Sequence, residues 1–241
     1  MSMLGQAALA MWWDMAGAMR ADFEHWHSHE HFPERLAIPG FRRASRWSDA
    51  RGGEGVFQMY ELEDHGVLSS GPYLARLNAP SPWSTRMMPH HRNMVRSQCG
   101  VLESHGGVTA RHALTVRLSP APGSDGDILR QQLAPLLAQL PGRAGLTGAH
   151  LLQHRTPAIA QTTEQKIRGG DSFADWVLVA TGYDAQALQA LERAEFGQAA
   201  LATLGASPGS VSGLYQLSYS ATPVDTASVP PFSPPASEAD R

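Results

Sequence analysis

Residues 25 to 47, HWHSHEHFPERLAIPGFRRASRW, pass from one kind of secondary structure into another. The first part continues a helical pattern that opens with an N-cap candidate, Asp22, and runs to about Leu36. Pro39 and Gly40 end this pattern, because proline cannot continue a helix and glycine accepts the backbone angles of a tight turn. FRRASRW then shows the alternation of a strand. The stretch therefore predicts a helix that turns directly into a sheet.

The segments around this stretch complete an α+β unit. An apolar run at residues 6 to 15 predicts a buried first strand, and residues 55 to 64, GVFQMYELED, predict a hairpin partner for FRRASRW. The glycine-rich SDARGGEG lies between the two arms as a turn. A shorter helix at 66 to 78, an irregular proline-rich passage at 79 to 91 and an extended segment at 93 to 103 follow. The predicted order is strand, helix, strand, strand, helix, strand.

The second half of the chain repeats this order. Its expected elements are a strand at 112 to 120, a helix at 126 to 142, strands at 147 to 155 and 174 to 183, a helix at 184 to 204 and a strand at 211 to 221. Each copy is a ferredoxin-like β-α-β-β-α-β unit whose open sheet face needs a cover. We therefore predict an α+β fold of two tandem units, residues 1 to 108 and 109 to 221, packed sheet to sheet as an α+β barrel. Residues 222 to 241 combine prolines with small polar residues and are expected to form a disordered tail.

The composition is that of a soluble globular protein, with 241 residues, 42% hydrophobic and 17% charged, and a net charge of −3. The arginines are scattered, which argues against a nucleic-acid binder. No apolar run reaches the roughly 18 to 20 residues that cross a membrane. The single cysteine, Cys99, excludes a disulfide framework and a four-cysteine zinc site within the chain, and a cytoplasmic location fits best.

Four of the eleven histidines fall between residues 25 and 31. Residues four apart share a helix face, which gives three polar pairs: His25 with His29, His27 with His31, and Glu30 with Glu34. Imidazoles titrate near neutral pH, and nearby carboxylates raise their pKa and fix one tautomer. One reading is acid/base chemistry by His31 with Glu30 or Glu34, and another is a metal site at His27 and His31, an HxxxH spacing. The HExxH string of zinc proteases is absent, and a structural role for His31 stays open as well.

Residues outside this helix add candidates for a binding pocket. Arg42 and Arg46 share one face of the predicted strand and could bind a carboxylate or a phenolate. Tyr73 and Trp83 flank the second helix of the first unit and could wall the pocket. The histidines at 90 and 91 sit in a loop from which they could reach the site. No glycine-rich phosphate loop is present, which argues against a nucleotide cofactor.

The string HWHSHEHFPERLAIPGFRRASRW, followed by MYELED and GPYLARLNAPSPW, resembles the dimeric α+β barrel superfamily, in particular its EthD-like members. The resemblance covers about residues 5 to 105, and the second half matches by architecture. Glu30, His31, Pro33 and Glu34 stand at the signature positions, and the resemblance implies that His31 faces a cavity between sheet and helix. This fold hosts quinone-forming monooxygenases, lactone isomerases, polyketide cyclases, dehydratases and haem-degrading enzymes. The tandem second half and the three further histidines depart from the short EthD-like form.

We therefore expect a small-molecule enzyme that moves a proton on an aromatic or carbonyl-bearing substrate, as a lyase, an isomerase or a cofactor-free oxygenase. The expected catalytic residues are His31, Glu30 and Glu34, and the expected substrate-binding residues are Arg42, Arg46, Tyr73 and Trp83. No organic cofactor is expected. Two alternatives stay open: a non-catalytic ligand-binding or stress-response barrel, and a metal- or haem-dependent oxidoreductase in which His27 and His31 bind a divalent metal. The expected partner is the small-molecule substrate, and a homodimer is left open.

Overall fold

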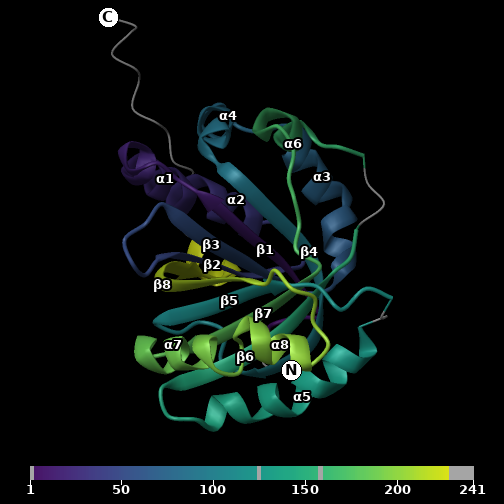
Figure 1. Cartoon of the computed structure of the whole chain (residues 1–241). Coiled ribbons are helices and arrows are strands. Elements are labelled where there is room, and N and C mark those ends of the chain that lie inside the picture. The colour runs from purple at the N-terminus through teal and green to yellow at the C-terminus, as the bar shows by residue number, and fades with distance from the viewer. Residues whose placement is uncertain (1–2, 124–125, 157–159, 228–241) are drawn as a thin grey trace, which may run out of the picture.

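The computed structural model describes residues 3–123, 126–156 and 160–227. Eight antiparallel strands form its centre and close into a barrel (Figure 1). They are β1 (Ala7–Asp14), β2 (Phe41–Asp49), β3 (Gly55–Leu62), β4 (Arg92–Gly106), β5 (His112–Leu118), β6 (Leu146–His154), β7 (Trp176–Gly182) and β8 (Val211–Ala221). Their order around the barrel is β1-β3-β2-β8-β5-β7-β6-β4.

The two halves of the chain contribute their strands in the same order, β4-β1-β3-β2 and β8-β5-β7-β6. The pairs β2–β8 and β4–β6 join the two sheets, so one chain supplies a complete barrel without a free sheet edge. The predicted fold class, an α+β barrel of ferredoxin-like units, is confirmed. The predicted division of the chain at residue 108 falls between β4 and β5 and stays a prediction.

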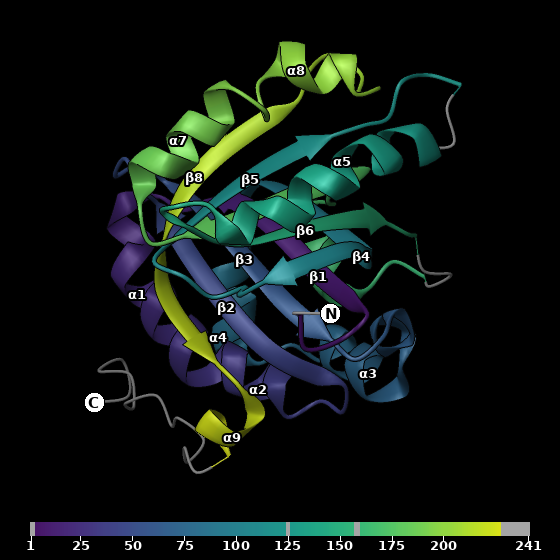
Figure 2. The ribbon, with the colours of Figure 1, turned by 90° about the horizontal axis from the view of Figure 1, so that it is seen from below.

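Helices cover the outside of the barrel in two groups (Figures 1 and 2). The first group consists of η1 (Gly17–Met19), α1 (Arg20–Trp26), η2 (His27–His31), α2 (Phe32–Leu36), η3 (His65–Ser69), α3 (Gly71–Asn78), α4 (Pro82–Met87), η4 (Met88–His90) and α6 (Thr163–Arg168). The second group consists of α5 (Asp127–Gln139), η5 (Leu140–Gly142), α7 (Ala185–Arg193) and α8 (Gln198–Thr203). The short helix α9 (Pro223–Thr226) follows β8 and packs against α2. Although α6 belongs to the second half of the chain, it contacts α3 and η4 of the first.

The alternation of side chains along each strand sorts apolar residues between the barrel interior and the helix-covered outer faces. On β1, Trp12 points into an interior cluster with Trp47 and Phe57, whereas Trp13 points outward beneath the first helix group. The second helix group lies on a leucine-rich cluster that includes Leu129 of α5. Burying such a side chain stabilises the fold by about 1.5 to 3 kcal/mol. Three apolar clusters therefore hold the barrel and its two coats of helices together.

Three expectations about helices need correction. The passage at 79 to 91, expected to be irregular, holds α4 and η4, because Ser81 accepts a hydrogen bond from the Ser84 N–H and Pro82 occupies the first turn, where its missing N–H costs nothing. The helix expected at 184 to 204 is two helices, α7 and α8, with a break before Gly197. The short α6 was not expected at all; Thr162 and Gln165 form its capping box.

Only residues 222 to 227 of the expected tail belong to the described part of the chain. Residues 222 to 227 include α9, whose capping box is made by Thr222 and Asp225, so disorder was the wrong expectation for this part. The rest of the expected tail, 228 to 241, lies outside the described residues. Among the residues that the structure describes, no helix has the length and apolar character to span a membrane.

Candidate functional site

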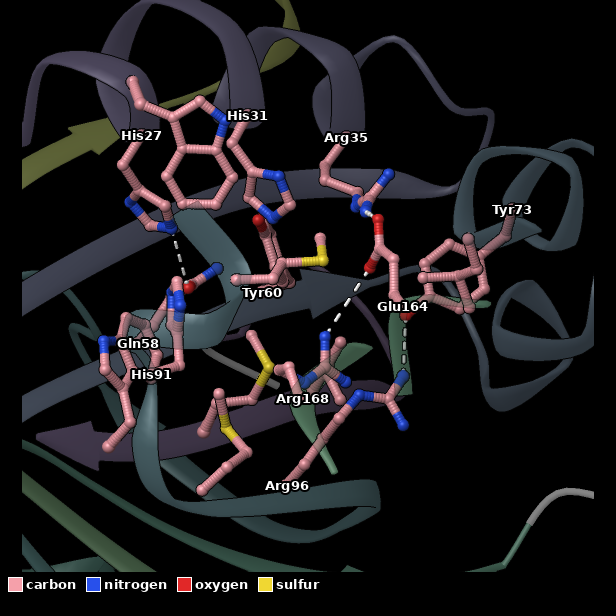
Figure 3. Close-up of a pocket in the computed structure, with 17 residues that line it drawn as sticks. His27, His31, Arg35, Gln58, Tyr60, Tyr73, His91, Arg96, Glu164 and Arg168 are labelled. Atoms are coloured by element: carbon pink, nitrogen blue, oxygen red, sulfur yellow. Dashed lines mark hydrogen bonds and ion pairs between the residues drawn. The ribbon is translucent and has the colours of Figure 1, made fainter. Parts of the chain in front are cut away.

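One continuous helix, made of α1, η2 and α2, carries His27, His31 and Arg35 on the face that looks toward the barrel (Figure 3). Its middle turn, η2, is π-helical: the N–H of Phe32 donates to the carbonyl of His27, five residues earlier. Pro33 supplies no N–H, so a regular α-helical ladder could not continue through it. Such single π turns are often found at functional sites.

Beneath this helix lies an inner cavity, enclosed between the outer face of β1, β3 and β4 and the helices η2, α3 and α6. It holds about 40 Å³ of water-accessible space, enough for about three water molecules. Its polar lining consists of His27, His31, Arg35, Gln58, Tyr60, Tyr73, His91, Arg96, Glu164 and Arg168 (Figure 3). Methionine and tryptophan side chains complete the wall. The cavity is thus small, largely apolar in its walls and dense in ionisable groups.

His27 is fixed from both sides of its ring. The guanidinium of Arg46 lies 3.2 Å from Nδ1 and can only donate, so Nδ1 accepts and Nε2 carries the proton that is donated to Gln58 Oε1 at 3.0 Å. Burial lowers the pKa of His27 well below its usual value, and the Arg46 charge lowers it further. His27 is therefore a neutral imidazole with both nitrogens engaged.

His31 has quite different surroundings. Its ring stacks on that of His27 at 5.3 Å and lies 4.6 Å from the Trp26 ring. The side chain points into the inner cavity (Figure 3), and its buried Nδ1 has no hydrogen-bond partner. Burial lowers the pKa of His31 well below its usual value, with smaller contributions from the charges of Arg35 and Arg168. His31 is thus a neutral base with an unused ring nitrogen beside a cavity.

His91 completes the histidine lining from the strand side. Its Nδ1 donates to the carbonyl of Met87 at 3.1 Å, which leaves Nε2 as the acceptor nitrogen. The ring packs at 5.0 Å from that of Trp13. Burial lowers the pKa of His91 to about 3, so this imidazole is neutral at any ordinary pH.

A buried chain of charges crosses the cavity from α2 to α6. Arg35 pairs with Glu164, and Glu164 lies 3.7 Å from Arg168, which binds Asp171 at 2.9 Å. The side chains of Arg35 and Glu164 are only 3% and 4% exposed. Burial opposes the charge on Arg35, but the carboxylates of Glu164 and Glu34 outweigh it and raise the pKa of Arg35. The contact between α6 and the first half of the chain is therefore ionic at its centre.

Arg96 is the cavity's uncompensated cation. It is 7% exposed, and its Nη2 donates to the hydroxyl of Tyr73 at 2.7 Å. No carboxylate of the described residues lies within ion-pairing distance of it. A buried guanidinium without a counter-ion is costly, and its forked geometry suits a carboxylate or an enolate oxygen. The inner cavity therefore offers an anion site in the same lining as His31.

Glu30 and Glu34, the expected catalytic carboxylates, lie outside the inner cavity. Each precedes a cavity-facing residue by one position, which turns it by about 100° around the helix axis. Glu30 accepts hydrogen bonds from the Ser81 hydroxyl and from Trp26 Nε1, whereas Glu34 lies 3.4 Å from Arg35. The carboxylate that does line the cavity is Glu164.

The four expected substrate-binding residues lie in different parts of the structure. Tyr73 lines the inner cavity, and Arg46 lies behind His27 rather than in the lining. Arg42 is half exposed and pairs with Glu63. An irregularity in the β2–β3 register between residues 41 and 43 changes the face of the sheet from which its side chain projects. Trp83 is buried in the first helix group, where its Nε1 donates to Asp22. Of the other histidine candidates, His91 lines the cavity.

Several lining residues escaped the sequence reasoning. Arg35 could have been found, because it continues the i, i+4 series of His27 and His31. Gln58 and Tyr60 alternate on β3 with residues that point into the barrel interior, a signal that requires the strand register to be known. Nothing in the sequence linked Glu164 and Arg168 to a site 130 residues earlier. The six-residue helix that carries them is short and polar.

The residues present do not fit the metal or haem of the third alternative. His27 has no free nitrogen lone pair, and the described residues contain no group of three or more His, Cys, Asp or Glu side chains able to hold a metal ion. A macrocycle does not fit a cavity that has room for about three water molecules.

Comparison with solved structures gives the fold relatives of the chain. An anthrone oxidase-like protein aligns with a TM-score of 0.61 at 13% identity, over 94% of this chain and 97% of that one. Candidate monooxygenases from Fusobacterium nucleatum and Lactobacillus acidophilus align with TM-scores of 0.58 and 0.57 at 10% and 6% identity, each over 91% of this chain and 96% and 97% of theirs. The chain has the α+β barrel fold. No protein-family model and no curated protein matches it in sequence, and its EthD-like character stays a prediction.

Proposed function

We propose that this protein is an enzyme that moves a proton on an aromatic or carbonyl-bearing small molecule, with His31 as the general base and without an organic cofactor. One observation carries the proposal: a neutral, buried imidazole with an unpartnered Nδ1 lines a cavity that also holds the uncompensated guanidinium of Arg96. A base must be unprotonated before it can act, and burial keeps His31 in that form.

The reaction would begin with His31 removing a proton from a carbon next to, or conjugated with, a carbonyl, as in the keto form of a phenol. The C–H bond breaks, its electron pair moves onto the substrate oxygen, and Arg96 donates hydrogen bonds to the oxyanion that develops. This negative charge raises the pKa of the His31 imidazole as the proton arrives, because opposite charges favour each other. His27, locked between Arg46 and Gln58, holds the stacked His31 ring in place.

The resulting carbanion can follow any of the three expected courses. A proton returned to another carbon gives an isomerase, loss of an adjacent leaving group gives a lyase, and reaction with O₂ gives a cofactor-free oxygenase. The solved structures that share the fold include an anthrone oxidase-like protein and candidate monooxygenases, and for this reason we rank the oxygenase course first. Glu164, the carboxylate of the cavity, is paired with Arg35 and Arg168, and we assign it a structural role.

The proposal is tested by a substrate screen with matched variants. Chelator-dialysed protein is offered anthrones, hydroquinones and 1,3-diketones, and O₂ consumption and absorbance changes are recorded. We expect turnover by the wild type and a loss of at least about 100-fold in His31→Gln, the usual contribution of a general base. The exposed His25 provides the control, since His25→Gln should change turnover less than about twofold.

Two results would count against this account. The metal-dependent alternative predicts that His27→Gln and His31→Gln lose bound metal and activity in the same proportion. Full activity in a correctly folded His31→Gln variant would remove the base from the mechanism altogether.

A further inference from the structure

The inner cavity has room for the reacting end of an aromatic substrate but not for the whole molecule, and a second space lies directly against it. This outer chamber is open to solvent, holds about 690 Å³ and is formed where β4 begins, together with Arg117 of β5 and the end of α6. A volume of several hundred Å³ is usual for small-molecule sites. The outer chamber therefore has the capacity that the inner cavity lacks.

Three side chains belong to the walls of both spaces: His91, Met94 and Arg168. Met94 is unbranched and adaptable, and it separates the two spaces together with the imidazole of His91. A ligand in the outer chamber thus meets the inner cavity across a wall about one side chain thick. Its reacting end would pass this wall while its remaining part stayed in the outer chamber.

Arg117 gives the outer chamber a specific chemistry. Its strand neighbours Val116 and Leu118 pack under the second helix group, so Arg117 points to the barrel side, where its guanidinium lies over the Trp12 ring at 5.4 Å. It is partly buried, and burial lowers its pKa. No carboxylate of the described chain forms an ion pair with it: Asp14, an acid close enough to influence it, is bound by the Asn93 amide at 2.7 Å.

The backbone of the outer chamber is unusual as well. Asn93 has a φ of 54°, the one positive φ outside glycine among the residues described. Non-glycine residues pay for this conformation, and it tends to persist where the surroundings fix it. Here the Asn93 amide donates to Oδ2 of Asp14, which holds Asn93 in place and engages one oxygen of this carboxylate. No described residue accepts a hydrogen bond from the Arg117 guanidinium at the chamber wall.

We propose that the outer chamber is the binding site for the distal part of a carboxylate-bearing aromatic ligand, and that Arg117 pairs with this carboxylate and determines specificity. The inference rests on the proposed function in one respect, namely that the reacting end lies in the inner cavity. The Arg117 guanidinium lies over the Trp12 ring, and two parallel N–H groups along one edge of a guanidinium match a carboxylate. The substrate class is then an aromatic carbonyl or phenolic compound with a carboxylate remote from the reacting carbon.

The test measures binding and needs no turnover. The probes are 2-naphthoate and its neutral isostere 2-naphthamide, titrated by calorimetry into wild type, Arg117→Gln and Arg130→Gln. Arg130 lies on α5, is half exposed and pairs with Glu103, so it controls for the loss of one charge far from the chamber. We expect the wild type to prefer the naphthoate at least tenfold, Arg130→Gln to keep this preference, and Arg117→Gln to lose it. The indole N–H of Trp12, which donates to Thr115 at 3.1 Å, should shift in the NMR spectrum on binding.

Equal affinity of the wild type for the two probes would overturn the proposal, as would an undiminished preference in Arg117→Gln. If Arg117→Gln does not fold, Arg117→Lys replaces it: a reduced preference supports the forked contact, and an unchanged one contradicts it. His31→Gln should retain the naphthoate preference. Failure of the proposed chemistry would therefore appear as absent turnover with intact binding, whereas failure of this inference would appear in the binding ratio alone.

Discussion

His27 and His31 lie one helical turn apart, and the structure gives them different surroundings. Arg46 and Gln58 occupy both nitrogens of His27, whereas the Nδ1 of His31 has no partner. Both rings are nevertheless neutral, since burial lowers the pKa of each below the range in which histidine usually titrates. An imidazole whose two nitrogens are both hydrogen-bonded can orient its neighbour. One with an unpartnered nitrogen can exchange a proton.

These buried histidines predict how stability depends on pH. In the unfolded chain His27, His31 and His91 bind protons as pH falls through about 6.5, while the folded protein binds them only at much lower pH. Stability should therefore be constant above pH 7 and fall below about 6.5, by up to about 1.4 kcal/mol per pH unit for each group. Urea unfolding at pH 7, 6 and 5 measures this, and His31→Gln should remove about one group's share of the slope. Unchanged stability between pH 7 and pH 5 would contradict the neutral, buried state.

At the scale of single residues, the sequence predicted the spacing but not the environment. The pairs His25–His29 and His27–His31 are indeed neighbours, at 4.6 and 5.3 Å between ring centroids, because helix geometry alone determines them. Which face of the helix would be buried depends on packing against β3 and α6, and this separated His31 from Glu30. The Arg96 contact with Tyr73 joins two elements whose relative positions no local pattern contains.

Among the elements, α6 is the one that closes the inner cavity, and it does so from the other half of the chain. Its Glu164 pairs with Arg35, and the backbone N–H of its first residue, Thr163, donates a hydrogen bond to Oδ1 of Asn78 on α3. Gly169 follows it in a left-handed conformation, the usual helix stop. No helix was expected here, because six residues give too little periodicity to reveal one.

The ionic contact of α6 predicts the effect of Glu164→Gln. Removing one partner of a buried ion pair costs up to about 3 to 5 kcal/mol of unfolding free energy, and the loss should stay below that limit here because Arg35 keeps Glu34 and Arg168 keeps Asp171. Amide hydrogen exchange in α6 should accelerate in the same variant. Glu195→Gln is the control, because the Arg143–Glu195 pair is 40% and 35% exposed and such pairs contribute at most about 1 kcal/mol. Equal losses in the two variants would show that α6 is not held by this pair.

For the whole molecule, the closed barrel has a consequence for assembly. Eight strands from one chain pair around the full circle, so no edge requires a second chain. We expect the melting temperature to be the same, within about 1 °C, at 1 and 100 μM protein, since only stability that depends on subunit association varies with concentration. A rise of several degrees over this range would show that a dimer is part of the folded state.

The two halves share a strand order but not a site. Beneath the first helix group lies the inner cavity with its charges, whereas the corresponding space beneath α5 and α7 is filled by a leucine-rich cluster. The repeated order of elements was readable from the sequence, because strand and helix periods differ sharply. The histidines between residues 25 and 31 also pointed to the first half as the one that carries chemistry. The closing of that half by α6 became visible only in the folded chain.

Deuterium incorporation shows whether His31 itself moves the proton. A substrate found in the screen is incubated in D₂O without oxygen and with chelator-dialysed protein, and ¹H NMR follows the loss of its acidic C–H signal. We expect the wild type to accelerate the exchange and His31→Gln to slow it at least about 100-fold, while His25→Gln behaves as the wild type. Exchange at the wild-type rate in folded His31→Gln would contradict this role of His31.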